Sequence, residues 1–253
     1  MLSSREQNPN GQGPSRADLA RAGFINTTRA QRLLAETVLT PLLEATPVGL
    51  LLADLADSPD PDQATLALVR LCEASPKPQQ LAQDLKRSSH RRRLLALLGA
   101  SSALGDFLIA HPDSVACLDQ EFDAEKVAAT MASRVKRALE AGSIPDAVHA
   151  LRLSYYQALC AIAAGDLTHP QPLQYMPQVG LQLSQLADAA VAAALPIAYR
   201  KAGASDQLAF CVIAMGKTGA RELNYISDVD VMYVVGGQLD ETQATAAGSA
   251  VAS

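Results

Sequence analysis

Apolar residues recur at three- and four-residue steps through most of the first 200 positions, which is the spacing of α-helices that bury one side. The pattern is clearest over 123–141, where apolar residues fall at every fourth position: Val127, Met131, Val135 and Leu139. Similar spacing predicts helices over 28–45 and 178–199. Pro145 begins another long helix, which Gly165 ends. We therefore expect a mainly helical region.

The boundaries of this region follow from local composition. The stretch 1–14 is polar and contains Asn, Gly, Gln and Pro, so we predict a disordered tail there. The helical region then spans 15–203, and the loop-like stretch 73–79 is the best candidate for a break between subdomains. The most apolar run, 187–197, is interrupted by Asp and Pro and is too short to span a bilayer.

The pattern changes after position 204. The apolar run 208–215 has the length of a fully buried strand, and 229–235 is rich in β-branched and aromatic residues, as a second strand would be. Between them Gly216 starts a sharp turn, at which a backbone can approach a ligand closely. We predict an α+β protein: a helical array followed by the start of a mixed β-sheet domain over 204–253.

Asp228 and Asp230 lie at the start of the second predicted strand. Side chains two apart on a strand point to the same face, so these carboxylates are expected to converge. Two adjacent like charges need a neutralising partner, and Mg²⁺ bound by carboxylates and substrate phosphates is the usual one. The alternative is an acid pair that caps a strand in a solvated turn. The strand and the glycine turn favour a metal site for phosphoryl or nucleotidyl transfer.

A P-loop is excluded. Gly216, Lys217 and Thr218 fit the end of that motif, but its first glycine would stand five residues before Gly216, where the chain has Cys211 inside the apolar run.

Composition narrows the class further. The 253 residues are 49% hydrophobic and 4% aromatic, which suits a helix-rich core, and the net charge of -5 argues against non-specific binding to DNA or an anionic membrane. The four cysteines are scattered in apolar contexts, so we expect buried thiols. The four histidines lack metal-ligand spacing. The N-terminus lacks the apolar core of a signal peptide, so a cytoplasmic location is expected.

The stretch 86–93 is the one dense basic cluster. It is either a patch for phosphate or an acidic partner, or the solvated face of a helix whose other side carries leucines. The general behaviour of charge runs on amphipathic helices favours the second interpretation.

The residues around the turn also carry a resemblance. Ala214-Met215-Gly216-Lys217, Gly219, Arg-Glu-Leu-Asn-Tyr over 221–225 and Ser227-Asp228-Val229-Asp230 closely resemble the signature of the bifunctional glutamine synthetase adenylyltransferase/adenylyl-removing enzymes, within the nucleotidyltransferase superfamily. Thr218 and Ala220 depart from that signature, where Leu and Gly are expected. Weaker similarity extends upstream to about Leu94.

The resemblance implies a function. Enzymes of this family carry two nucleotidyltransferase halves: the front half removes AMP from a tyrosine of glutamine synthetase by phosphorolysis, and the back half attaches AMP from ATP. A long helical segment before the motif matches the front half. By position, Asp228 and Asp230 would be catalytic magnesium ligands, and Gly216, Lys217 and Ser227 would bind the nucleotide. Glutamine synthetase, ATP, ADP, phosphate and a PII-type regulatory protein are the implied partners, with no DNA and no membrane.

One expected element is missing from the sequence. Such sites use a third carboxylate on a neighbouring strand, and Asp240 and Glu241, the only later acids, fit the start of a helix instead. We therefore expect a truncated catalytic domain that is inactive alone. Two classes stay open: a fragment of the enzyme, or a helical binding module whose incomplete nucleotidyltransferase part senses nucleotide.

Overall fold

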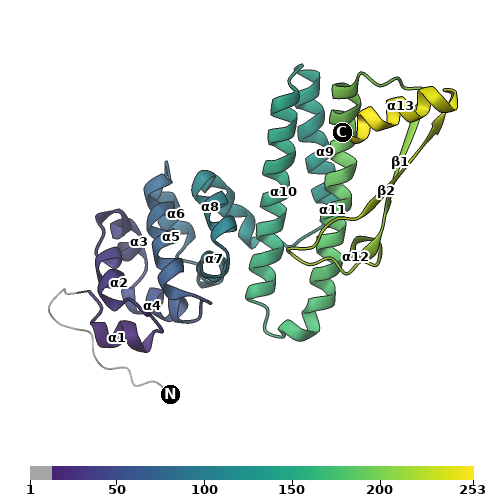
Figure 1. Ribbon diagram of the computed structural model, residues 1–253. Helices are drawn as coiled ribbons and strands as arrows, with labels where there is room; N and C mark the ends of the chain where they lie inside the picture. Colours follow the sequence, from purple (N-terminus) through teal and green to yellow (C-terminus); the bar gives the residue numbers. More distant parts are fainter. Residues whose placement is uncertain (1–12) are drawn as a thin grey trace. The chain divides into compact units, whose positions relative to one another are not determined.

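The computed structural model describes residues 13–253, which form two compact units divided between Asp119 and Gln120 (Figure 1). The predicted tail over 1–14 lies outside the described residues except for Gly13 and Pro14. The stretch 73–79, proposed as a subdomain break, lies within the first unit. Helices expected to belong with the preceding array share the second unit with the sheet.

The first unit consists of short helices around a leucine-rich core. Its elements are α1 Arg16–Arg21, α2 Thr27–Leu34, η1 Thr37–Leu39, α3 Thr40–Ala45, α4 Val48–Ala56, α5 Pro61–Ala74, α6 Pro78–Asp84, α7 Ser88–Ala100, α8 Ser102–Ala110 and η2 Pro112–Asp119. Helix α7 is central, because every residue over 94–99 is buried. A capping box begins α1, where Asp18 N–H donates to Ser15 Oγ and Ser15 N–H donates to Asp18 Oδ2.

The basic cluster at the start of α7 differs from the prediction of a solvated face. Arg91 is 3% exposed, and its Nε lies 2.5 Å from Asp54 Oδ2 on α4. His90 is 1% exposed, with Nδ1 2.9 Å from Asp119 Oδ1. Arg87 pairs with the same carboxylate. The cluster is therefore divided: His90 and Arg91 form buried polar contacts that join η2 and α4 to α7, whereas Lys86, Arg87 and Arg92 are exposed.

The second unit begins with three long helices, α9 Ala124–Glu140, α10 Ile144–Leu167 and α11 Pro172–Ala202, which pack against one another. The predicted amphipathic stripe of α9 is confirmed, with Met131 and Val135 fully buried. The predicted ends of the other two helices were wrong. Helix α10 continues beyond Gly165 to Leu167. Helix α11 starts before position 178 and is 31 residues long, with Pro177 and Pro196 inside it.

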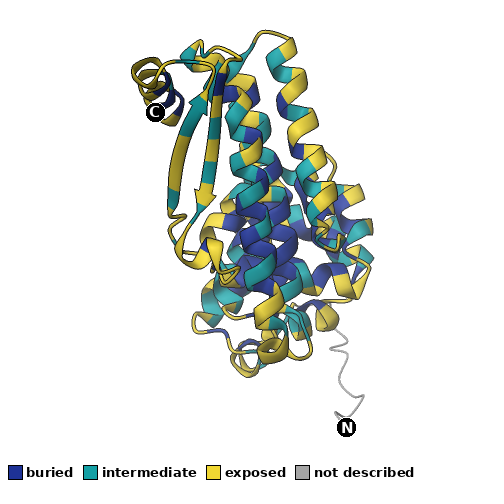
Figure 2. Cartoon of the chain, turned by 90° about the vertical axis from the view of Figure 1, so that its right-hand side faces the viewer, coloured by how far each residue is buried: buried dark blue, intermediate teal, exposed yellow. Residues whose placement is uncertain are grey.

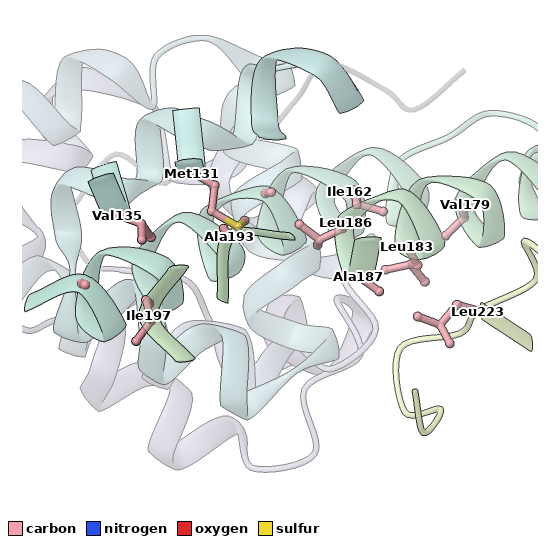
Figure 3. Packing of buried hydrophobic residues seen from close by; sticks show 12 residues of the cluster. Met131, Val135, Ile162, Val179, Leu183, Leu186, Ala187, Ala193, Ile197 and Leu223 are labelled. Carbon is pink, nitrogen blue, oxygen red and sulfur yellow. The ribbon is translucent and has the colours of Figure 1, made fainter. Parts of the chain in front are cut away.

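The core of this unit lies between the helices (Figure 3). Met131 and Val135 from α9 meet Leu186 and Ala193 from α11, and α10 contributes Ile162. At about 25 cal/mol per Å² of buried apolar surface, such contacts dominate the stability of a bundle.

Helix α11 is covered on more than one side. Within 179–191 no residue is classed as exposed. By length and apolar composition α11 is the one described helix that would by itself reach across a bilayer, and the bent pair 37–56 meets the same test together. A helix that is apolar all round is equally typical of a buried core, and α11 packs against α9, α10 and α13.

The sheet of the described residues has two antiparallel strands, β1 Leu208–Ala214 and β2 Val231–Gly237, with Ala214 opposite Val231. The short helix α12 Gly216–Gly219 follows β1, and α13 Glu241–Ala252 follows β2 with Asp240 as its N-cap, as expected for these acids. The helical majority with a small antiparallel sheet confirms the α+β class.

The strands are more exposed than predicted (Figure 2). Only Leu208 of β1 is buried, and burial then alternates between half-buried and exposed positions. Cys211 lies on the exposed face, so the expectation of four buried thiols was wrong for it, although Cys72, Cys117 and Cys160 are buried. Burial raises the pKa of Cys72 and of Cys117 to about 12.

Candidate functional site

The turn after β1 requires glycine at position 216 for two reasons. Gly216 has φ of +51°, a conformation that residues with a Cβ rarely adopt. A Cβ built on Gly216 would stand 2.8 Å from Asp230 Oδ2, so the missing side chain leaves room for that carboxylate. Met215 N–H donates to the Asp230 carbonyl at 2.8 Å, which extends the strand pairing by one step. The structure thus brings Gly216 and the Asp230 carboxylate together.

Asp228 and Asp230 lie just before β2 rather than within it, because the strand starts at Val231 instead of Val229. Both residues are exposed. Within residues 13–253, neither carboxylate accepts a hydrogen bond or forms an ion pair. Two acids without a protein cation are suited to a positively charged ligand.

Lys217 and Ser227, both predicted to bind nucleotide, lie in contact. Lys217 Nζ donates to Ser227 Oγ at 3.3 Å. Ser227 Oγ in turn donates to Asn224 Oδ1 at 2.8 Å, and the same amide oxygen accepts from Ile226 N–H. Asn224 therefore fixes the turn that presents Ser227 and Asp228. Sequence reasoning gave Asn224 no separate role, although it lies inside the recognised motif.

Helix α12 has four residues, and its geometry is tight. A Cβ on Gly219 would stand 2.6 Å from the Ala214 carbonyl oxygen, so this second glycine is also required for close approach. The first N–H groups of a helix have no partner inside it. In the described part of the chain none of the N–H groups of Gly216, Lys217 and Thr218 meets an acceptor, so they are available to phosphate oxygens.

Thr218 lies behind the turn. It is 3% exposed and lines a cavity of about 370 Å³ between α11 and the sheet, together with Val191, Leu195 and Phe210. Its Oγ1 is buried without a hydrogen-bond partner among the described residues.

We expect Thr218→Val to stabilise the fold by about 1 kcal/mol, because a buried hydroxyl without a partner opposes folding. The measurement is the free energy of urea unfolding of the variant against the parent. Ser184→Ala is the contrasting variant. The buried Ser184 Oγ donates to the Gly180 carbonyl at 2.9 Å, so its removal should lower the free energy of unfolding. A loss of stability in Thr218→Val would show that this hydroxyl has a partner.

The arrangement fits a hard divalent cation in its donor set, although it is incomplete as a metal site. Two exposed carboxylates two residues apart are ligands that Mg²⁺ prefers. Among the described residues no group of three or more His, Cys, Asp or Glu side chains surrounds a common point, so the third carboxylate is not supplied by residues 13–253. The remaining ligands would be phosphate oxygens and water.

The chain matches known proteins over most of its length. Residues 91–252 match the sequence model of the family described as glutamate-ammonia ligase adenylyltransferase. Proteins named bifunctional glutamine synthetase adenylyltransferase/adenylyl-removing enzyme are similar. The one from Bifidobacterium longum subsp. infantis is 34% identical over 88% of this chain, and those from Streptomyces avermitilis and Mycobacterium avium are each 38% identical over 93% and 95%.

These alignments cover 22%, 23% and 24% of the three relatives, so the chain spans about a quarter of their length. The matched family region includes α7 to α11, the turn at Gly216 and both acids. The chain belongs to the glutamate-ammonia ligase adenylyltransferase family.

Proposed function

We propose that Gly216, Lys217, Ser227, Asp228 and Asp230 form a magnesium-dependent nucleotidyltransferase site that acts on adenylylated glutamine synthetase. The observation that carries this proposal is the approach of the Asp230 carboxylate to Gly216, in the space that a Cβ would fill. It puts an unpaired acid beside a turn that has free N–H groups and a lysine. Nucleotide phosphates need cations and N–H donors, and the metal needs the acids.

The direction we propose is removal of AMP. An oxygen of inorganic phosphate attacks the phosphorus of the tyrosine–AMP ester, the bond from phosphorus to the tyrosine oxygen breaks, and the tyrosine oxygen takes up a proton. The products are ADP and unmodified tyrosine. Support for this direction is the long helical region before the motif. The name of the relatives includes both the adenylyltransferase and the adenylyl-removing activity.

Each residue has a defined task in this scheme. Lys217 would act as a point charge beside the phosphates, with Ser227 as its hydrogen-bonded neighbour. Asp228 and Asp230 would hold Mg²⁺, which would neutralise negative charge on the transferred adenylyl group. Gly216 keeps the backbone open, so that phosphate oxygens and the Asp230 carboxylate reach the same side of the turn.

The first test is calorimetric titration of ADP into the chain, with Mg²⁺ and then with EDTA. We expect saturable binding that requires the metal. The second test mixes the chain with adenylylated glutamine synthetase and phosphate and follows ADP release. Because residues 13–253 supply two carboxylates and no visible third, we expect little or no turnover from this polypeptide alone. Metal-independent ADP binding, or none, would contradict the proposal.

Gly216→Ala tests the geometry directly. The added methyl meets Asp230 Oδ2 at 2.8 Å and opposes φ of +51°, so the acid must move. We expect ADP affinity in the presence of Mg²⁺ to fall by about 10-fold, which is about 1.4 kcal/mol. Gly236→Ala is the matched control, because no atom lies within 4 Å of its added Cβ. Equal effects of the two variants would argue against a specific role for Gly216.

A second candidate is a partner-binding helical module that senses nucleotide without turnover. The two-carboxylate site of residues 13–253 is the observation that favours it. Introducing Asp230→Asn into a longer protein of this family that contains this chain separates the two candidates. Loss of phosphorolysis there supports the enzyme, whereas a parent protein without phosphorolysis and with metal-dependent nucleotide affinity supports the sensor.

A further inference from the structure

We propose that residues 221–225 form a tether that fixes the acid pair against α10 and α11. This tether makes Asp166, Ser184 and Asp188 positioning residues of the nucleotidyl site. The inference rests on the proposed function for its chemistry, but its structural basis is independent of it. The five residues lie between α12 and the acids. Their contacts fall into two sets, one to the long helices and one to the residues of the site.

The odd-numbered residues face the helices. Arg221 forms an ion pair with Asp188 of α11. Leu223 is 7% exposed and belongs to the core cluster, where it points towards Leu183 and Ala187 (Figure 3). Tyr225 completes the set, because its hydroxyl donates to Asp166 Oδ2 at 3.0 Å. Leu223 is the buried member of this set, whereas Arg221 and Tyr225 are exposed.

Two further hydrogen bonds link the segment to the phosphate-side residues Lys217 and Ser227. Glu222 N–H donates to the Lys217 carbonyl at 2.9 Å, and Asn224 accepts from the Ser227 hydroxyl at 2.8 Å. The same five residues therefore hold the helices with one set of contacts and the phosphate-side residues with the other. The sequence separation is large, since Tyr225 and Asp166 are 59 positions apart.

Two local features show that the tether is held under constraint. Arg221 has φ of +64° and is the one residue other than glycine with positive φ among those described. Such a conformation persists where surrounding contacts impose it, and the Asp188 ion pair and the buried Leu223 are those contacts. Leu223 N–H also donates to Ser184 Oγ at 3.3 Å, in a buried position.

Asp166 is the second feature. It lies in the last turn of α10, where the helix dipole disfavours a negative charge. The Tyr225 hydroxyl gives this carboxylate a donor there. Desolvation, and then Asp166 itself, raises the pKa of Tyr225, so the phenol remains a neutral donor at physiological pH. Asp166 is therefore placed for the tether rather than for its own helix.

The experiment compares Tyr225→Phe with Tyr199→Phe. Both variants lose one phenol hydrogen bond of 3.0 Å in the same unit, since the Tyr199 hydroxyl donates to the Leu208 carbonyl at the far end of β1. We expect Tyr225→Phe to weaken Mg²⁺-dependent ADP binding about fivefold, and Tyr199→Phe to leave it unchanged. Asp166→Asn keeps an acceptor oxygen and should behave like the parent, whereas Asp166→Ala should match Tyr225→Phe.

A second readout needs no ligand. The Met215 amide donates to the Asp230 carbonyl, so its hydrogen exchange reports on the pairing of the turn with the acids. We expect faster exchange at Met215 in Tyr225→Phe and in Asp188→Ala, but not in Tyr199→Phe.

The two readouts separate the possible failures. If the parent chain binds no ADP with Mg²⁺, the proposed function fails, and Met215 exchange alone tests the tether. If Met215 exchange and ADP affinity are both unchanged in Tyr225→Phe, while its thermal stability falls as much as in Tyr199→Phe, the tether only stabilises the fold and the inference is overturned.

Discussion

Asp230→Asn is expected to lower the affinity for ADP in the presence of Mg²⁺ by at least about 100-fold, or about 2.8 kcal/mol. The substitution keeps the size of the side chain but removes the charge that a divalent cation requires. It also leaves the Met215 to Asp230 backbone bond in place, because that bond uses the carbonyl. The fold should therefore survive.

Asp240→Asn is the matched control for this result. Asp240 is an exposed acid outside the site that caps α13 through the Gln243 N–H at 2.9 Å, and Asn caps a helix about as well as Asp. The measurement is calorimetric titration of ADP with Mg²⁺ for the parent and both variants. Similar affinities in all three would mean that Asp230 holds no metal.

Arg91→Met is expected to destabilise the first unit by about 3–5 kcal/mol, because removal of one partner leaves a buried charge uncompensated. Asp54 would lose a guanidinium at 2.5 Å, and the Leu85 carbonyl would lose the donor Nη1 at 2.9 Å. The measurement is urea unfolding followed by far-ultraviolet circular dichroism.

Arg92→Met controls for the loss of one positive charge from the same helix, since Arg92 is exposed. A change within about 0.5 kcal/mol is expected for such a surface position. Equal destabilisation by the two variants would contradict the buried polar contacts of Arg91. A double variant that also replaces Asp54 with Asn should recover part of the loss, because the unpaired charge is then removed.

The sequence predicted part of the local geometry of the candidate site, namely the turn at Gly216 and the neighbourhood of Lys217 and Ser227. Glycine at 216 predicted the close approach of a ligand, and in the structure the Asp230 carboxylate lies in the space left by the missing Cβ. Lys217 and Ser227, predicted to lie along the same phosphates, contact each other. Whether Asp228 and Asp230 share a metal stays a prediction. Short spacings carry this information because turns and strands fix directions over a few residues.

The long-range contacts that hold the site against the helices could not be predicted from the sequence. The pairs Tyr225–Asp166 and Arg221–Asp188 join residues 59 and 33 positions apart, and periodicity says nothing about which distant side chains meet. Burial of Arg91 was missed for the same reason, since its partner Asp54 lies on another helix. A charge run predicts solvent only where no such partner exists.

The predicted start of the last long helix was wrong because a proline was taken to lie outside it. The helix predicted over 178–199 leaves Pro177 outside, yet Pro177 lies in the first turns of α11, where few hydrogen bonds are lost. The exposure of Cys211 was missed because an apolar run predicts burial on both faces of a strand. In these two strands the second face, with Ile213, Met232 and Val234, is exposed.

The low exposure of residues 179–191 in α11 has a consequence for the substitutions that this helix tolerates. A surface helix such as α9 alternates buried and exposed positions, so a saturation mutagenesis map of it shows tolerant and intolerant residues with a period near 3.6. Every residue over 179–191 is buried or half-buried, and the Asp188 side chain, 44% exposed, forms the ion pair with Arg221. Substitutions over 179–191 should therefore be poorly tolerated without a 3.6-residue period. Some would disturb the bundle core, and others, at Ser184 and Asp188 among them, would disturb the site.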